Sequence, residues 1–494
     1  MRILLIDPYV TVSANLSTSL GWLSASVRAA GHEVFVLDLN CRRISDYREV
    51  LPEFISRYAP HMIGITVMCT TYVPMLRMVN HLANYYKGYI AVGGAQIAFE
   101  KENALRDGPR FDFAVIGDGE ETTVELLDCL EEKGDLSQIK GLIYRDGGQI
   151  KSNEPRKWWE SDLNKLPFPD FRLFGLEKVP STYSYRVSTS RGCPFHCIFC
   201  NPITMRSKWR SRNFDLVIEE LRFAKAEFGV QRFNLCEPVF NLTKERVIEF
   251  CEKLLKEQIN MPWTGSSGFR AKPIDDEMVR IMQKSGFYDL KIGVETLSPN
   301  IFPNLDKGEC IDDIINAVEV AKRNGLRIEG SFIIGLPGST YKTEMDSFKR
   351  AQKLGFTKMV WSLLIPYPGT RAYDWVQEHG TMYYDYKQAH QYMGEVVSDE
   401  QLRVAFETPE FPLKDRIKAL EKISWKLKQS GIGQRNYSML KKTAKTIYSL
   451  ARFDPWNLWG NLNYIARGTI SEFKRRKKYG EEPFFQFKDL SEII

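Results

Sequence analysis

The sequence predicts an α/β protein: a parallel sheet covered by helices, then a series of β/α units, and then a mostly helical tail. Three observations lead to this prediction. Short apolar runs alternate with amphipathic stretches over residues 1–145, the same alternation returns over 186–375, and the composition changes over 376–494. Residues 146–185 are interpreted as a linker. A chain of 494 residues is too long for one ordinary core, so two or three domains are expected.

The N-terminal region contains five strand candidates, which are RILLID, EVFVLDL, MIGITVM, YIAVGGA and FDFAVIGDG. Strands that are buried on both faces have continuous apolar sequences, so these runs predict a parallel sheet between two layers of helix. A parallel sheet of this kind binds ligands beyond the carboxyl ends of its strands.

The loops at those strand ends are small or rich in glycine, which lets the backbone approach a ligand closely. The candidate ligand contacts there are Thr66, Gly93, Gly94, Gly117, Gly119 and Glu120. The first strand is followed by DPYVTVSANLSTSLG and not by GxGxxG, which disfavours NAD or FAD. On this pattern alone, a sheet without any cofactor is an equally good interpretation.

The stretch RVSTSRGCPFHCIFCNP, residues 186–202, places Cys193, Cys197 and Cys200 within eight positions. Structural zinc needs four ligands, usually from two paired half-sites, and the sequence has no second CxxC or HxxxH pair. Three thiolates suit an iron–sulfur cluster that leaves one iron open to another ligand. The spacing therefore favours an iron–sulfur cluster, with zinc as the alternative.

The CxxxCxxC spacing, with Phe199 just before the third cysteine, resembles the signature of radical S-adenosylmethionine (radical SAM) enzymes. The resemblance implies that the three cysteines hold a [4Fe-4S] cluster and that its open iron chelates S-adenosylmethionine. An electron from an external donor of the flavodoxin or ferredoxin type would then yield a 5′-deoxyadenosyl radical. The family fold is a partial or full β/α barrel in which the cluster loop follows the first strand.

Five further strand candidates follow the cysteines, and on a β/α barrel their carboxyl ends face one mouth. By the family resemblance, Glu237 is expected to bind the amino group of S-adenosylmethionine. Arg270 is expected to bind its carboxylate or a substrate anion, and Glu295 the ribose or the substrate. It also gives the adenine contact to a glycine-rich segment with Gly335, Pro337 and Gly338. Cys-Glu-Pro stands where the family usually has Asp-Asp or Gly-Gly-Glu-Pro, and the alternative for each charged residue is a salt bridge at a strand end.

A flavodoxin-like sheet before such a barrel resembles the cobalamin-binding subgroup of the family, over about residues 1–375. The matching stretches are LGWLSASVRAAGHEV, VGGAQ, DFAVIGDGEET, LPFPDF and IPYPGT. The resemblance implies that the loops of the sheet hold a corrinoid with its upper face toward the barrel mouth. The sequence lacks Asp-x-His-x-x-Gly, so a histidine below the cobalt is not expected.

These cofactors predict the methylation of an unactivated carbon in a small-molecule or lipid-like substrate. One S-adenosylmethionine would supply the methyl group of cobalamin and a second would supply the radical. The runner-up is a radical oxidoreductase or cyclase that uses the same cofactors without methyl transfer. A third alternative is a corrinoid carrier or sensor with an inert barrel.

The tail is basic, with 18 Lys and Arg against 8 Asp and Glu from Phe411 onward, whereas the whole chain has a net charge of +6. Helical segments at 414–431 and 436–452 and the run KRRKK at 474–478 predict either a helical cap or an interfacial helix on anionic lipid. No nucleic-acid partner is expected.

The apolar runs of the chain are shorter than a membrane span, and Asp7 interrupts any signal peptide. We therefore expect a cytoplasmic protein, with peripheral contact on the inner membrane face as an option.

Overall fold

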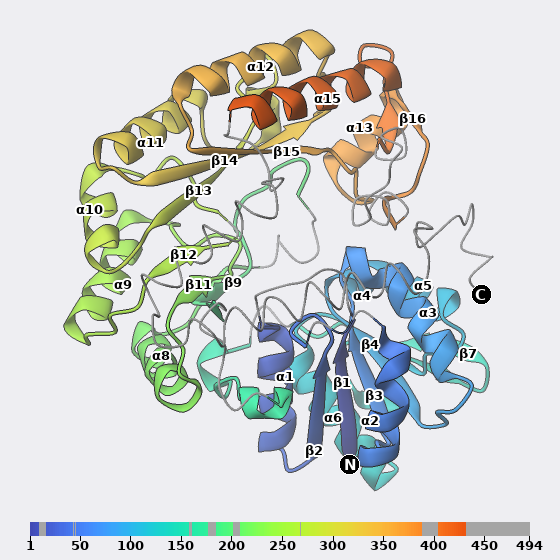
Figure 1. Ribbon diagram of the computed structural model, residues 1–494. Coiled ribbons are helices and arrows are strands. Elements are labelled where there is room, and N and C mark those ends of the chain that lie inside the picture. Colours follow the sequence, from blue (N-terminus) through green and yellow to red (C-terminus); the bar gives the residue numbers. More distant parts are fainter. Residues whose placement is uncertain are drawn as a thin grey trace.

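The computed structural model describes residues 1–8, 16–42, 44, 46–157, 161–175, 184–200, 208–266, 268–387 and 404–430 (Figure 1). Three sequence features lie outside these ranges: residues 9–15 of the stretch after the first strand, the helical segment at 436–452 and the basic run at 474–478. The α/β fold class that the sequence predicts is confirmed.

The N-terminal domain is a seven-stranded sheet with the order β2-β1-β3-β4-β5-β6-β7. Its parallel strands are β1 (Arg2–Asp7), β2 (Glu33–Asp38), β3 (Met62–Thr66), β4 (Tyr89–Gly93) and β5 (Phe113–Val115). The helices are α1 (Thr18–Ala29), α2 (Leu51–Tyr58), α3 (Tyr72–Leu82), α4 (Ala95–Glu100), α5 (Glu102–Asp107) and α6 (Gly119–Glu132). Ile3 and Leu5 pack with residues of α1 and α6, whereas Leu4 and Ile6 pack with α2 and α3. The alternating side chains of β1 therefore face two helical layers.

The parallel sheet is extended by an antiparallel hairpin, β6 (Leu142–Asp146) and β7 (Gln149–Ser152). Its two-residue turn, Gly147–Gly148, has positive φ at both positions. Glycine at both positions suits the tight turn whose twist matches that of the strands. The hairpin extends beyond residue 145, where the sequence predicts that the linker begins.

The linker packs against the N-terminal domain between residues 161 and 175. Gly21 of α1 has no side chain, and a Cβ there would lie 2.8 Å from the Pro169 Cβ. Arg28 pairs with Asp170 at 2.8 Å, and Arg42 donates to the Phe174 carbonyl at 2.7 Å. The linker is therefore held against α1 by close packing and by Arg28, and near the end of β2 by Arg42.

The second domain is a partial barrel of six parallel strands (Figure 1). The strands are β8 (Tyr185–Val187), β11 (Phe233–Leu235), β12 (Trp263–Gly265), β13 (Asp289–Glu295), β14 (Arg327–Ile334) and β15 (Lys358–Leu363). Two groups of three, β12-β11-β8 and β13-β14-β15, are joined by single bridges from Trp263 to Phe287 and from Phe269 to Ile292. The helices are α8 (Phe214–Phe228), α9 (Lys244–Lys256), α10 (Asp276–Lys284), α11 (Ile311–Arg323), α12 (Tyr341–Leu354) and α13 (Arg371–His379).

A short antiparallel pair closes the base of the cysteine loop. β9 (Ser190–Arg191) enters the loop, β10 (Arg210–Ser211) leaves it, and Arg191 lies opposite Arg210. We call this pair the neck of the cysteine loop. All three cysteines follow β9 within the loop that the neck closes.

The C-terminal region adds the strand pair β16 (Thr381–Met382) and β17 (Phe406–Glu407), and then the helix α15 (Leu413–Ser430). Ile423 and Leu427 of α15 are buried in the barrel core, with Ile417 and Leu420 packed against it. This stretch of the tail is a helical cap on the barrel. Among the described residues, no helix combines the length and apolarity needed to cross a membrane.

Candidate functional site

The loop with Cys193, Cys197 and Cys200 lies at the carboxyl end of the first barrel strand. All three thiols are half-buried, and none of the nine cysteines is in a disulfide. The loop is tied to the barrel by its backbone: Ile198 donates to the Leu305 carbonyl at 3.0 Å and accepts from the Ala372 amide at 3.1 Å. Phe199 packs partly buried against two hydrophobic clusters of the chain.

Two cations lie beside the cysteine loop. The Arg270 guanidinium stacks on the Phe195 ring at 3.4 Å and donates to the Lys307 carbonyl at 2.7 Å. Burial raises the pKa of the Cys197 thiol to about 11, and Lys307 and Arg270 act against that rise. Burial also raises the pKa of the Cys193 thiol, and Arg270 again opposes it. These positive charges favour the thiolate form that metal ligation requires.

Arg270 and Glu295, which the sequence predicts as site residues, belong to a buried group of four charges. Lys307 lies 3.3 Å from Glu295 and 3.4 Å from Glu309, and Arg270 lies 3.6 Å from Glu309. The side chain of Glu309 has no exposed surface. Lys307 and Glu309 were not predicted, because the stretch DKGEC has the appearance of an exposed turn.

Glu295 has an unusual backbone conformation at the end of β13. Its φ is 64°, and the pairing of β13 with β14 shifts between Gly293 and Glu295. A Cβ on Gly293 would meet the Glu295 carboxylate, so the glycine makes room for that side chain. Backbone strain of this kind persists where the surrounding structure holds a side chain in a required position.

Glu237 lies just beyond the end of β11 and is buried. It accepts hydrogen bonds from the Thr189 amide at 2.9 Å and from the Ser190 hydroxyl at 2.7 Å. Burial raises the pKa of Glu237 to about 7, with the opposing effect of Ser190 next in size. The carboxylate therefore ties β11 to the residues just before the cysteine loop.

The glycine-rich segment after β14 contacts the C-terminal helix. Gly335 has φ +88°, and a Cβ there would lie 2.3 Å from Nη1 of the buried Arg416. The Gly335 amide donates to Glu344 at 3.0 Å, and Gly338 also has positive φ. Pro337 lies between the two glycines, so the three predicted residues form one turn at the barrel mouth.

The predicted contacts after β3 and β4 come together at the carboxyl edge of the N-terminal sheet. The Val67 amide donates to the Gly93 carbonyl at 2.8 Å. Gly94 has φ +104°, and a Cβ there would lie 2.8 Å from the Val67 carbonyl oxygen and 3.1 Å from the Thr66 hydroxyl. Only glycine fits this close approach.

Two carboxylates lie at the ends of β1 and β2: Asp38 is buried and Asp7 is half-buried. Burial and the neighbouring Asp38 raise the pKa of Asp7 to about 7. Burial raises the pKa of Asp38 to about 6, against hydrogen bonds from the backbone of Cys41, Ser17 and Asn40. This edge of the sheet therefore also carries two carboxyl groups whose pKa values are raised.

The loop after β5 contacts the barrel domain directly. Glu120 pairs with Arg191 at 2.7 Å, and Asp118 pairs with Arg191 at 2.7 Å and with Arg210 at 3.0 Å. Gly117 has positive φ and Gly119 begins α6, so both shape this loop. Of these residues the sequence predicts only Gly117, Gly119 and Glu120; the Arg-Gly-Cys order before Cys193 was the one available signal for Arg191.

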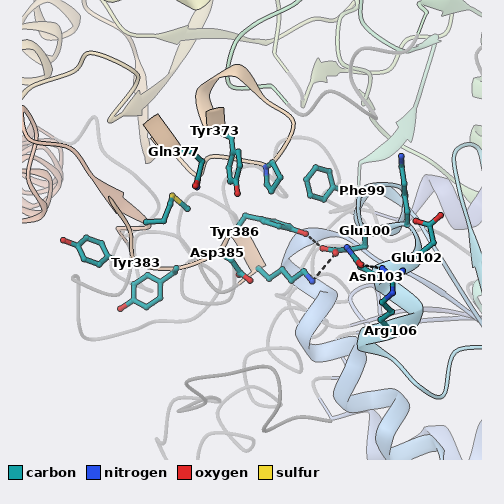
Figure 2. A pocket seen from close by; sticks show the side chains of 15 residues that line it. Phe99, Glu100, Glu102, Asn103, Arg106, Tyr373, Gln377, Tyr383, Asp385 and Tyr386 are labelled. Atoms are coloured by element: carbon teal, nitrogen blue, oxygen red, sulfur yellow. Dashed lines mark hydrogen bonds and ion pairs between the residues drawn. The ribbon is translucent and has the colours of Figure 1, made fainter. Parts of the chain in front are cut away.

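A second contact between the domains lies beside a cavity of about 770 Å³ (Figure 2). Tyr386 points toward Glu100 and hydrogen-bonds to it, and Lys387 pairs with Glu100 at 3.1 Å and with Asp107 at 2.7 Å. The cavity is lined by α4 and α5 on one side and by α13, β16 and the residues after β16 on the other. Its aromatic lining residues are Phe99, Tyr373, Tyr383, Tyr384 and Tyr386.

The residues present fit an iron–sulfur cluster and a corrinoid. In the described part of the chain, no three His, Cys, Asp or Glu side chains converge on a point where one metal ion would bind. A cluster differs from a single ion because each cysteine ligates a different iron, so its thiols lie further apart. The three half-buried thiols beside two cations suit such a cluster, and the glycine-lined sheet edge suits a large ligand.

The comparisons with known proteins agree with this arrangement. The B12 binding domain family matches residues 9–127, and the radical SAM superfamily matches residues 187–351. A protein of Pyrococcus horikoshii described as an uncharacterized methyltransferase is 30% identical over 391 residues, which cover 76% of this chain and 83% of that protein.

Two more distant relatives extend the comparison. The anaerobic magnesium-protoporphyrin IX monomethyl ester cyclase of Rubrivivax gelatinosus is 23% identical over 74% of this chain and 68% of the cyclase. The solved structure of the radical S-adenosylmethionine methyltransferase TsrM from Kitasatospora setae, with cobalamin and a [4Fe-4S] cluster bound, has a TM-score of 0.65 at 18% identity. That match covers 75% of this chain and 76% of TsrM, and at this identity it supports the fold alone.

The two domain families and the Pyrococcus relative therefore confirm the resemblance that the cysteine spacing and the preceding sheet predict, and with it the three cofactors. The chain belongs to the cobalamin-dependent radical SAM enzymes, which use a [4Fe-4S] cluster, S-adenosylmethionine and cobalamin.

Proposed function

We propose that the protein is a C-methyltransferase that methylates an unactivated carbon of a small-molecule or lipid-like substrate. The observation that carries the proposal is the direct contact between the two halves of the chain. The neck of the cysteine loop pairs with the loop after β5 of the B12 binding domain at 2.7 Å. A methyl donor and a radical generator must act on one carbon, so their loops need to lie close together. The Pyrococcus relative, described as a methyltransferase, supports the same activity.

In this proposal, Cys193, Cys197 and Cys200 hold the cluster, and Arg270 with Glu295 binds the polar groups of S-adenosylmethionine. Lys307 and Glu309 keep those two side chains in place by pairing with them. The glycine edge at Thr66, Gly93 and Gly94 receives the corrinoid. When bound, the cofactors supply a hydrogen-abstracting radical and a methyl group.

The cavity in Figure 2 is the proposed route by which substrate reaches the space between the domains. Tyr373 and Gln377 line it from α13, whose second residue, Ala372, is a backbone partner of the cysteine loop. Phe99 lines it from α4, which follows the glycine edge. Aromatic walls of this kind suit a substrate with an apolar body. Gln377→Trp is expected to raise KM with a smaller effect on kcat.

Isotope labelling tests the methyltransferase activity. Reconstituted enzyme receives hydroxocobalamin, a reductant, an anaerobic metabolite extract and S-adenosylmethionine with a trideuterated methyl group. A methyltransferase yields a product three mass units heavier than its unlabelled form, together with S-adenosylhomocysteine and 5′-deoxyadenosine. Formation of 5′-deoxyadenosine without a labelled product and without S-adenosylhomocysteine contradicts the proposal.

That second outcome would instead support an oxidative cyclase, the alternative favoured by the Rubrivivax relative. Such an enzyme uses the same cofactors and removes hydrogen from its substrate without adding carbon. The two activities share the cysteine loop and the sheet edge, so product analysis separates them and mutation of those parts does not.

We also propose an external electron donor of the flavodoxin or ferredoxin type, because the enzyme needs a reductant.

We further propose that the protein is cytoplasmic and that its basic tail makes peripheral contact with the inner membrane face. Flotation on anionic vesicles tests the tail with full-length protein and a version ending at Ser430, which keeps α15. Equal binding by the two proteins would contradict the membrane role.

A further inference from the structure

The neck fixes the base of the cysteine loop to the N-terminal domain, while the Ile198 backbone ties the loop to the barrel. Arg191 and Arg210 face each other across the two-residue ladder of β9 and β10, and every cysteine ligand lies between them in sequence. Any rotation of this neck relative to the N-terminal domain would carry the whole cysteine loop with it. The contacts of the neck therefore help to set the position of the cysteines relative to the N-terminal domain.

Both neck arginines reach the same carboxylate. Oδ2 of Asp118 lies 2.7 Å from Arg191 and 3.0 Å from Arg210, and Glu120 takes the second branch of the Arg191 guanidinium at 2.7 Å. The side chains of Arg191 and Arg210 are only 18% and 10% exposed. Two neighbouring arginines this well buried require a carboxylate between them, because an unpaired buried charge is costly.

Helix α1 of the N-terminal domain completes the arrangement. The Trp22 ring lies under the Arg191 guanidinium at 4.6 Å, and the Thr18 hydroxyl donates to the Arg186 carbonyl of β8 at 3.3 Å. An arginine held by carboxylates and by an aromatic ring has little freedom to move. The neck is therefore clamped from two elements of the B12 binding domain.

We propose that Asp118 and Glu120 are positioning residues that fix the cluster at a set distance from the corrinoid. Their loop follows β5, the strand next to β4, and β4 ends in the glycine edge where the corrinoid is expected. The same short loop therefore borders one cofactor and holds the neck of the other. The inference rests on the proposed function only where methyl transfer is the readout.

The test uses two variants, Asp118→Asn and Glu120→Gln, and the matched control Glu121→Gln. Asparagine suits the N-cap position that Asp118 occupies before α6, while it removes the charge. Glu121 lies next to Glu120 in the first turn of α6, but its partner is Arg156, at 2.8 Å. The control therefore changes the same helix by the same charge without loosening the neck.

The first readout is the magnetic interaction between cob(II)alamin and the reduced cluster in holoenzyme, measured by EPR. It depends on the distance between the two centres and needs no substrate. We expect Asp118→Asn and Glu120→Gln to weaken or broaden the interaction while iron, sulfide and corrinoid contents stay near those of the parent. Glu121→Gln is expected to keep the spectrum of the parent.

The second readout is the ratio of S-adenosylhomocysteine to 5′-deoxyadenosine, formed with titanium(III) citrate and hydroxocobalamin. Cleavage of S-adenosylmethionine needs only the barrel, whereas methyl transfer needs both halves in register. A misplacement of about 1 Å can cost roughly 100-fold in rate, so we expect the ratio to fall by at least about 10-fold. Glu121→Gln is expected to leave the ratio unchanged.

Two results would overturn the inference. The first is a parental EPR interaction in both Asp118→Asn and Glu120→Gln; the second is an equal change in Glu121→Gln, which would point to the charge of α6 alone. If Asp118→Asn folds poorly, the EPR spectrum of Glu120→Gln alone tests the inference. That variant should still fold, because Asp118 continues to pair with both arginines. A parent that forms no S-adenosylhomocysteine would contradict the proposed function, and the EPR readout would still test the positioning role.

Discussion

The two domains present different surfaces to the space between them. The strand ends of the N-terminal sheet offer glycine at Gly93, Gly94 and Gly117; of their acids, Asp38 is buried and Asp7 is half-buried. The strand ends of the barrel offer charged side chains that are already paired, as in the group of Arg270, Glu295, Lys307 and Glu309. In the proposed sites, shape would select the large corrinoid on one side, and electrostatics would select the small charged S-adenosylmethionine on the other.

Removing the three thiols is expected to have the largest effect, because it should abolish cluster binding at the barrel and leave corrinoid binding at the sheet edge. Replacing Cys193, Cys197 and Cys200 with alanine is expected to abolish iron and sulfide binding and to reduce the cleavage of S-adenosylmethionine to background. The corrinoid content after reconstitution should stay at the parental level, because the sheet edge is untouched. Metal analysis and optical spectra measure both. Retention of four irons per chain would show that other residues hold the cluster.

Lys307→Met tests whether the charge balance of the barrel mouth also supports its stability. The change leaves Glu295 and Glu309 buried without their shared cation, which should cost about 3–5 kcal/mol of unfolding free energy. Lys349→Met is the control, since Lys349 pairs with Asp346 on the surface. Denaturant unfolding compares the two variants. Equal stability would mean that the four charges contribute little as a group.

Gly94→Val tests the shape of the sheet edge. The left-handed backbone and the close Val67 carbonyl should make this change cost about 1–3 kcal/mol and lower corrinoid affinity while iron content stays unchanged. Gly147→Val is the control, because Gly147 also has positive φ but has open space around it. Equilibrium binding of hydroxocobalamin measures the affinity. Parental affinity in Gly94→Val would place the corrinoid elsewhere.

Asp7→Asn tests the pH dependence of the stability. Burial raises the pKa of Asp7 from 3.8 to about 7 and that of Asp38 to about 6. A carboxyl whose pKa is higher in the folded state favours folding at low pH. That contribution is lost as the pH rises from about 4 to about 7. Over this range the Tm of the parent should fall more steeply than that of Asp7→Asn, and equal slopes in calorimetry would contradict the assignment.

The parts of the site that could be predicted are local in sequence. The cysteine spacing lies within eight residues, and the glycines follow directly after apolar strands, so their positions depend on the chain on either side. The helical segment predicted at 414–431 also matches α15 closely. In each case the information and the structure lie within one element.

The parts that could not be predicted depend on pairing between distant segments. Arg191 and Asp118 are 73 residues apart, and each alone has the appearance of an ordinary exposed charge. Lys307 and Glu309 stand in a polar turn. They are buried because Arg270, which follows β12, packs against this turn and pairs with Glu309. Glu237 was identified as a site residue from the family pattern. Its contacts with Thr189 and Ser190 could not be predicted, because they depend on the pairing of β11 with β8.

The contact of Gly335 with Arg416 has a consequence for chimeric enzymes. A barrel taken from this protein and joined to the tail of a relative would lose the arginine that fills the space above Gly335. The reverse exchange would press that arginine against any side chain at position 335. The two positions should therefore be exchanged together, and a junction placed after Ser430 avoids the conflict.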